Sequence, residues 1–121
     1  MINNIKGSFQ GWRKSIFDYI SKNKDKIPVY AKMFVDQGDF SDAAILYQKV
    51  KDSKNTEFFY QKAIENVESI QDGMQLYDFG VFLEQRKEIK LAIDIFNKAL
   101  ENGVQNSAKK IRELNKLKLN Q

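Results

Sequence analysis

The side chains that most often carry out catalysis are missing from this chain, which contains no His and no Cys. Without them, the commonest arrangements for general acid–base and nucleophilic catalysis cannot form. Carboxylates do cluster near one expected turn, at Asp36, Asp39 and Asp42. Because Asp39 and Asp42 fall in the first turn of an expected helix, where negative charge favours the helix dipole, we interpret them as structural. The sequence therefore predicts a protein that is not an enzyme, with no catalytic residue and no metal site.

The motifs and the charge distribution of the sequence bear on whether the chain binds phosphate groups or nucleic acid. No GxxxxGKS/T or GxGxxG loop occurs, so no cofactor is expected. Residues 1–26 carry six Lys or Arg against two Asp or Glu, residues 105–121 carry five against one, and residues 27–104 carry nine against thirteen. RNA binding through basic terminal helices is an alternative function, although the aromatic side chains fall on apolar stripes rather than in an exposed groove. The expected basic patch at the C-terminal end consists of Lys109, Lys110, Arg112, Lys116 and Lys118.

Any binding site in this chain would be positioned by helices. The clearest helical pattern runs through residues 73–106. Both halves of this stretch keep one face apolar at the helical period, with a tight turn between them. Gly80 and Ala92 are small residues on otherwise bulky apolar faces, which lets two helices approach closely. The large and small apolar positions are Leu76, Phe79, Gly80, Leu83, Ile89, Ala92, Ile93, Phe96, Ala99 and Leu100.

This stretch resembles a tetratricopeptide (TPR) repeat, whose signature has a large apolar residue, Leu-Gly, an aromatic residue and two Ala at fixed spacing. It departs from the family pattern at Lys87-Glu88, where Gly-Asp is usual, and at Val104, which replaces a closing Pro. The resemblance implies an all-α fold: a short, right-handed superhelical solenoid of about seven antiparallel helices that binds other proteins. The positions that match the signature are Leu76, Phe79-Gly80, Leu83, Ala92, Phe96 and Ala99.

A second copy of the pattern occupies residues 24–53. Gly38 is placed where a helix end needs a left-handed residue, and Pro28 is placed in a first helical turn, where its missing amide costs nothing. The remaining matches are Ile27, Tyr30-Ala31, Phe34, Asp39-Phe40, Ala43, Tyr47 and Val50.

The other segments are expected to be single helices within one domain, residues 1–121. Residues 8–22 form an N-terminal helix whose Trp12 fills the core. Residues 56–70 form a degenerate, unpaired helix with Thr56 as its N-cap. Residues 107–119 form a capping helix with Ala108, Ile111 and Leu114 or Leu117 along one side.

We therefore expect a non-catalytic scaffold or adaptor, a subunit of a larger complex that binds a partner peptide or helix in a concave groove. A small helical-repeat chaperone for a secreted client is an alternative. No apolar run is long enough for a transmembrane helix, and no secretory signal is present, so the expected compartment is the cytoplasm. By analogy with the family, partner-binding residues are expected off the packing stripe of each first helix, at Lys32, Met33, Asp36, Tyr77, Asp78, Val81 and Glu84.

Overall fold

The computed structural model describes residues 5–119 of the 121-residue chain. Within those residues the fold is all-α, with seven α-helices and no strand, which confirms the expected class and helix number. The chain divides into two compact units, which meet in the sequence between Val67 and Glu68. We call them unit 1 and unit 2, and each is described by itself.

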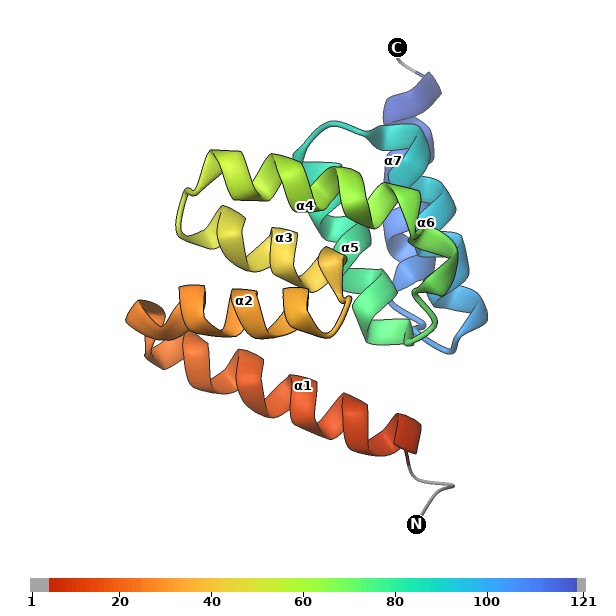
Figure 1. Cartoon of the computed structure of the whole chain (residues 1–121). Helices are drawn as coiled ribbons and strands as arrows, with labels where there is room; N and C mark the ends of the chain where they lie inside the picture. The colour runs from red at the N-terminus through yellow and green to blue at the C-terminus, as the bar shows by residue number, and fades with distance from the viewer. Residues whose placement is uncertain (1–4, 120–121) are drawn as a thin grey trace. The chain divides into compact units, whose positions relative to one another are not determined.

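Unit 1 contains the first four α-helices, which Figure 1 shows as successive rows from α1 to α4. The second row packs on the third and the third on the fourth. A single 3-10 turn links the first row to the second. The bounds are α1 Ile5–Lys22, η2 Lys24–Lys26, α2 Ile27–Asp36, α3 Phe40–Lys49 and α4 Ser53–Glu65.

The core of unit 1 is formed where α1, α2 and α3 meet. Ala31 and Ala43 are fully buried in it, as the small-residue positions of the repeat pattern predicted. Trp12 packs edge-on against Phe34, with ring centroids 5.5 Å apart, so it contributes to this core as expected. The fully buried Phe34 ring therefore holds α1 on α2.

A buried ion pair, which was not predicted, also joins α1 to α3. Arg13 donates two hydrogen bonds to the Asp42 carboxylate, at 2.8 and 2.7 Å, and both side chains are almost completely buried. Burial raises the pKa of the Asp42 carboxyl, while the hydrogen bonds from Arg13 oppose that rise. Asp42 is therefore more than a first-turn residue that favours the helix dipole, because it is the partner of a buried guanidinium.

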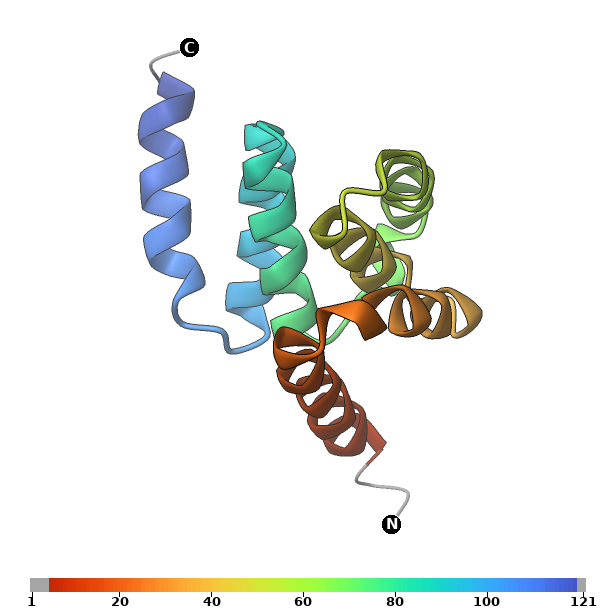
Figure 2. The same cartoon turned by 90° about the vertical axis from the view of Figure 1, so that its left-hand side faces the viewer.

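Unit 2 contains the last three α-helices, α5 (Gly73–Gln85), α6 (Ile89–Glu101) and α7 (Ser107–Leu119). The 3-10 turn η3 (Val67–Ser69) precedes them. The sixth helix packs on both the fifth and the seventh, and the three run alongside one another in Figure 2. The side chains that fill the interior are Leu76, Phe79, Leu83, Ala92, Ile95, Phe96, Ala99 and Leu114.

Close packing of α5 on α6 depends on Gly80, as the sequence predicted. A Cβ added at Gly80 would lie 2.7 Å from Cε1 of Phe96, which is closer than two carbon atoms can approach without displacement. Ala92 is likewise fully buried. The absence of a side chain at Gly80 thus makes room for the Phe96 ring.

Four helix ends share one backbone geometry, in which a left-handed residue follows the last turn. Gly38, Lys51, Lys87 and Gly103 have φ of 78°, 61°, 68° and 91°. In each case the next residue donates its amide to the carbonyl five residues back, as Asp39 does to Phe34 at 2.9 Å and Glu88 does to Leu83 at 3.0 Å. These bonds are those of the Schellman motif, which satisfies the last carbonyl groups of a helix. In the turn between α5 and α6, Lys87 therefore has the left-handed backbone that Gly38 has in the turn between α2 and α3.

Two helix starts differ from the prediction. The N-terminal helix begins at Ile5 rather than at residue 8. The helix expected over 56–70 begins at Ser53 and ends at Glu65, and its N-cap is Asp52, which accepts a hydrogen bond from the Asn55 amide at 3.1 Å. Thr56 lies inside this helix, and its hydroxyl donates to the Asp52 carbonyl at 2.7 Å. The carboxylate three residues before Asn55 competes better for the free amides than the Thr56 hydroxyl does.

Candidate binding cleft

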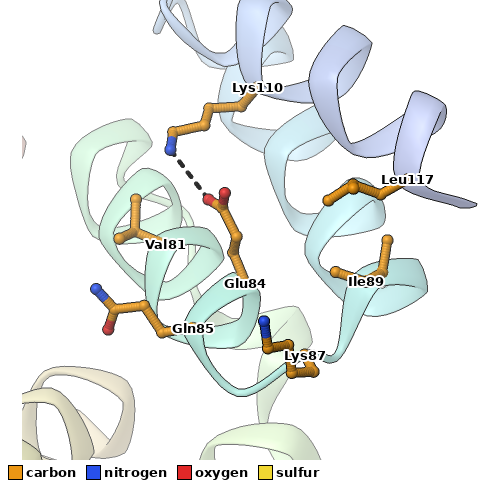
Figure 3. A pocket seen from close by; sticks show the side chains of 7 residues that line it. All are labelled: Val81, Glu84, Gln85, Lys87, Ile89, Lys110 and Leu117. Atoms are coloured by element: carbon orange, nitrogen blue, oxygen red, sulfur yellow. Dashed lines mark hydrogen bonds and ion pairs between the residues drawn. The ribbon is translucent and has the colours of Figure 1, made fainter.

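A cleft with mixed apolar and charged lining lies in unit 2 and has a volume of about 540 Å³. Its walls come from α5, from the turn that follows α5, from the start of α6 and from α7 (Figure 3). We call it the α5–α7 cleft. Its lining residues are Val81, Glu84, Gln85, Lys87, Ile89, Lys110 and Leu117.

The apolar part of the α5–α7 cleft arises from the register of α7. Leu114 is fully buried and takes the packing position, while Leu117, on the next turn of the same helix, is 51% exposed. Figure 3 shows the Leu117 side chain pointing toward Ile89, which lies at the start of α6. Val81 adds a half-buried side chain from α5. The cleft therefore offers an apolar surface, formed mainly by the exposed part of Leu117 and the half-buried Val81.

An ion pair crosses the cleft from α7 to α5. The Lys110 ammonium donates to Glu84 Oε1 at 3.0 Å, and fewer than a third of each side chain is exposed. This hydrogen bond raises the pKa of Lys110, since losing the proton would remove the bond to the carboxylate. The pair holds α7 in register on α5 and leaves two polar groups beside the apolar wall.

Lys87 places a second cation at the edge of the cleft. It lies in the tight turn between α5 and α6, with a left-handed backbone. Among residues 5–119, no hydrogen bond or ion pair is formed by its ammonium group. The ionisable groups lining the cleft are thus two lysines and one glutamate, with one lysine available to a ligand.

Two of the four predicted binding positions on α5 line the cleft, namely Val81 and Glu84. Tyr77 packs edge-on against Phe96, with ring centroids 5.4 Å apart, and is half-buried. Asp78 is half-buried and does not line the cleft. The N-terminal half of α5 therefore contributes to packing more than to the cleft.

The three predicted positions on α2 belong to unit 1. Lys32 and Asp36 form an exposed ion pair of 3.7 Å along the helix. Met33 packs partly against the core of unit 1. The α5–α7 cleft is lined by residues of unit 2 only.

The predicted basic patch on α7 has one member that is turned away from solvent. Lys110 is paired with Glu84, as described above. The other four remain exposed, so they form a solvated basic surface. They are Lys109, Arg112, Lys116 and Lys118.

No family model, curated protein or solved structure matches this chain. The part of the chain that the structure describes contains no group of three His, Cys, Asp or Glu residues placed to hold a metal ion. In the same residues, no helix is both long and apolar enough to cross a bilayer. Functional inference consequently depends on the geometry of the chain itself.

Sequence reasoning missed four lining residues, Gln85, Lys87, Ile89 and Leu117. For Leu117 a signal was present, because the pattern of residues 107–119 left open whether Leu114 or Leu117 faces the core. When two apolar side chains compete for one packing face, the one that remains outside is a candidate contact. The departure from the usual turn glycine drew attention to Lys87, but it did not indicate that the Lys87 side chain lines a cleft.

Proposed function

We propose that this chain is a non-catalytic protein-interaction module of the TPR-like helical-repeat type, acting as a subunit of a larger complex. In this proposal the α5–α7 cleft binds a peptide or a single helix of a partner protein. The observation that supports it most is the half-exposed Leu117, which lines a cleft crossed by the partly buried ion pair of Lys110 and Glu84. An apolar anchor beside fixed polar groups is the usual composition of a protein-binding surface.

Two features support the helical-repeat part of the proposal. The helix pairs α2–α3 and α5–α6 are joined by turns of the same geometry. Each turn has one residue with a left-handed backbone, Gly38 or Lys87, and the next residue donates its N–H to the carbonyl five residues back. In both pairs, small residues at corresponding positions are buried between the helices, as Ala43 and Ala92 are. Repetition of one supersecondary unit is what a short solenoid requires.

The cleft suits a partner segment with one large apolar side chain. Leu117, Ile89 and Val81 would contact that side chain, and the Lys87 ammonium would meet a polar or acidic group next to it. The packed helices hold this surface before binding, so little ordering is needed on the side of the scaffold.

Affinity capture with two matched leucine variants tests the proposal. Leu117→Asp places a carboxylate on the cleft wall, whereas Leu119→Asp makes the same change two residues on, at a side chain that is 86% exposed and does not line the cleft. We expect a partner identified by mass spectrometry to be retained by Leu119→Asp and lost by Leu117→Asp. A partner that both variants retain would contradict the role of the cleft.

Salt dependence separates this function from the alternatives. Binding through an apolar anchor should change little between low and physiological salt, whereas contacts between exposed charges weaken strongly. Capture of RNA with a steep loss of affinity in salt would instead favour the basic face of α7 as the binding surface. Capture of an unfolded secreted client by the wild-type chain would favour the chaperone.

A further inference from the structure

A second pocket, of about 340 Å³, lies in unit 1. It forms where α1 ends, η2 connects to α2, and α3 ends. Its volume is within the range of small-molecule sites, which begins at about 300 Å³. Its lining residues are Phe17, Ile20, Ser21, Lys24, Ile27, Lys49 and Val50.

The floor of this pocket is apolar and firmly held. Ile20 and Ile27 are 2% and 3% exposed and belong to the core of unit 1. Phe17 and Val50 are half-buried and pack against the same core. A hydrocarbon group placed here would therefore contact four apolar side chains whose positions are fixed by packing.

The charges around the pocket all have one sign. Lys24 and Lys49 supply two ammonium groups, and no carboxylate lines the pocket. Within residues 5–119 neither ammonium group has a hydrogen-bond or ion-pair partner. The Ser21 hydroxyl donates to the backbone carbonyl of Asp18. The Asp18 carboxylate accepts from Lys14 at 3.0 Å, so this carboxylate is engaged away from the pocket.

We propose that this pocket binds an aliphatic carboxylate, with its hydrocarbon chain on the apolar floor and its carboxylate between Lys24 and Lys49. An amphipathic cation would be repelled by the ammonium groups of Lys24 and Lys49. A neutral hydrocarbon would leave both ammonium groups without a partner. The combination of an apolar floor with two available cations is complementary to an amphipathic anion.

This assignment predicts how affinity depends on the ligand. Each methylene moved from water onto the floor should raise affinity about fourfold until the pocket is full. Two contacts between ammonium groups and a carboxylate at the pocket edge should together contribute about five- to tenfold. The site lies in unit 1 and uses none of the residues of the α5–α7 cleft, so it does not depend on the function proposed above.

Isothermal titration calorimetry of the full chain with hexanoate, octanoate and decanoate tests the proposal. We expect saturable binding that tightens with chain length, and much weaker binding of decyltrimethylammonium, which has an alkyl chain one carbon longer than that of decanoate and the opposite charge. The double variant Lys24→Gln/Lys49→Gln should weaken decanoate binding about five- to tenfold. The matched control Lys26→Gln/Lys54→Gln removes the same charge from two exposed lysines that do not line the pocket and should leave affinity unchanged.

Three outcomes would overturn the proposal. One is equal binding of decanoate and decyltrimethylammonium, and another is an equal effect of the two double variants. The third is no saturable binding of decanoate up to about 1 mM. If an acetylated Glu-Leu-Glu peptide binds and decanoate does not, the pocket is a protein-docking site instead. Leu117→Asp should leave decanoate binding unchanged, which separates this test from that of the α5–α7 cleft.

Discussion

Gly80 is the residue whose size most directly limits the packing of unit 2. Gly80→Ala would place a Cβ 2.7 Å from the Phe96 ring, and a fully buried ring cannot move away freely. We expect the free energy of unfolding to fall by about 1–3 kcal/mol through overpacking. Urea unfolding followed by circular dichroism measures this change.

Gly11 provides the matched control for this substitution. It lies inside α1, where an added Cβ would have no atom within 4 Å other than those of its own helical turn. Gly11→Ala should stabilise the chain by about 0.5–1 kcal/mol, because alanine favours the helix. If both variants change stability in the same direction, the close approach of α5 and α6 is not what Gly80 provides.

The Arg13–Asp42 pair allows a second test at the level of single residues. Asp42→Leu alone leaves a buried guanidinium without its carboxylate, and we expect a loss of about 3–5 kcal/mol. The double variant Arg13→Met/Asp42→Leu removes both charges and should be more stable than Asp42→Leu. Chemical unfolding of both variants and of Arg13→Met gives the coupling energy.

An exposed pair of the same helix serves as the comparison. The Lys14 ammonium lies 3.0 Å from the Asp18 carboxylate, and the two side chains are 78% and 68% exposed. Asp18→Asn should therefore change the free energy of unfolding by less than about 0.5 kcal/mol. A double Arg13/Asp42 variant that is no more stable than the single one would show that the pair is not the main contact of these two side chains.

Among the connecting elements, the turn between α5 and α6 carries avoidable strain. Lys87 has φ of 68°, a region that costs a residue with a Cβ about 1–2 kcal/mol. We expect Lys87→Gly to raise the free energy of unfolding by about 0.5–1 kcal/mol, since glycine adopts this conformation without a clash. Thermal unfolding measures the gain.

Lys90→Gly is a suitable control, because Lys90 is an exposed residue within α6. There glycine should lower stability by about 1 kcal/mol. A loss of stability in Lys87→Gly as well would mean that the lysine side chain, rather than its backbone, dominates at the turn.

The docking of α7 should depend on pH through Lys110. Its pKa is raised in the folded state by the hydrogen bond to Glu84, so the stabilisation is fully present below the unfolded pKa of about 10.4 and is lost as pH rises through the raised value. At pH values near 8, we expect the free energy of unfolding of the wild type to exceed that of Glu84→Gln by less than about 1 kcal/mol, because the ion pair is partly exposed. The difference should disappear near pH 12. A difference that persists there would assign the effect of Glu84 to packing.

Helix ends show which parts of the elements could be predicted. Gly38 and Pro28 were placed correctly, because both residue types restrict the backbone in a way that is visible in the sequence. The start of α4 was misplaced because Asp52 and Thr56 both have side chains that cap helices, and the prediction chose the weaker of the two acceptors. Lys87 could not be assigned a left-handed backbone, since lysine has no preference for it.

At the scale of the whole molecule, the division into two compact units has a direct test. Each unit has its own buried side chains, with Phe34 central to one and Phe96 to the other. We expect separately produced fragments 1–67 and 68–121 to be helical and to unfold cooperatively. Circular dichroism of each fragment measures this, and a disordered fragment beside a folded full-length chain would contradict it.

The all-α class and the helix number were expected from apolar periodicity together with the resemblance to a helical-repeat family, because both depend on patterns that are local in the sequence. What the sequence could not predict are contacts between residues far apart in the chain. Arg13 with Asp42 and Glu84 with Lys110 are examples, since neither partner lies in a pattern that marks the other. The α5–α7 cleft was only partly anticipated for the same reason: Val81 and Glu84 on α5 were predicted, whereas the lining residues that come from α6 and from the last turns of α7 were not.

The position of Trp12 has one more consequence, for optical measurements. It is the only indole in the chain, and it lies against Phe34 in unit 1. Its fluorescence emission during heating will therefore report when α1 separates from α2, and will be blind to events around Phe96. An emission curve that shifts at a temperature where most ellipticity remains would reveal that the halves of this chain melt one after the other.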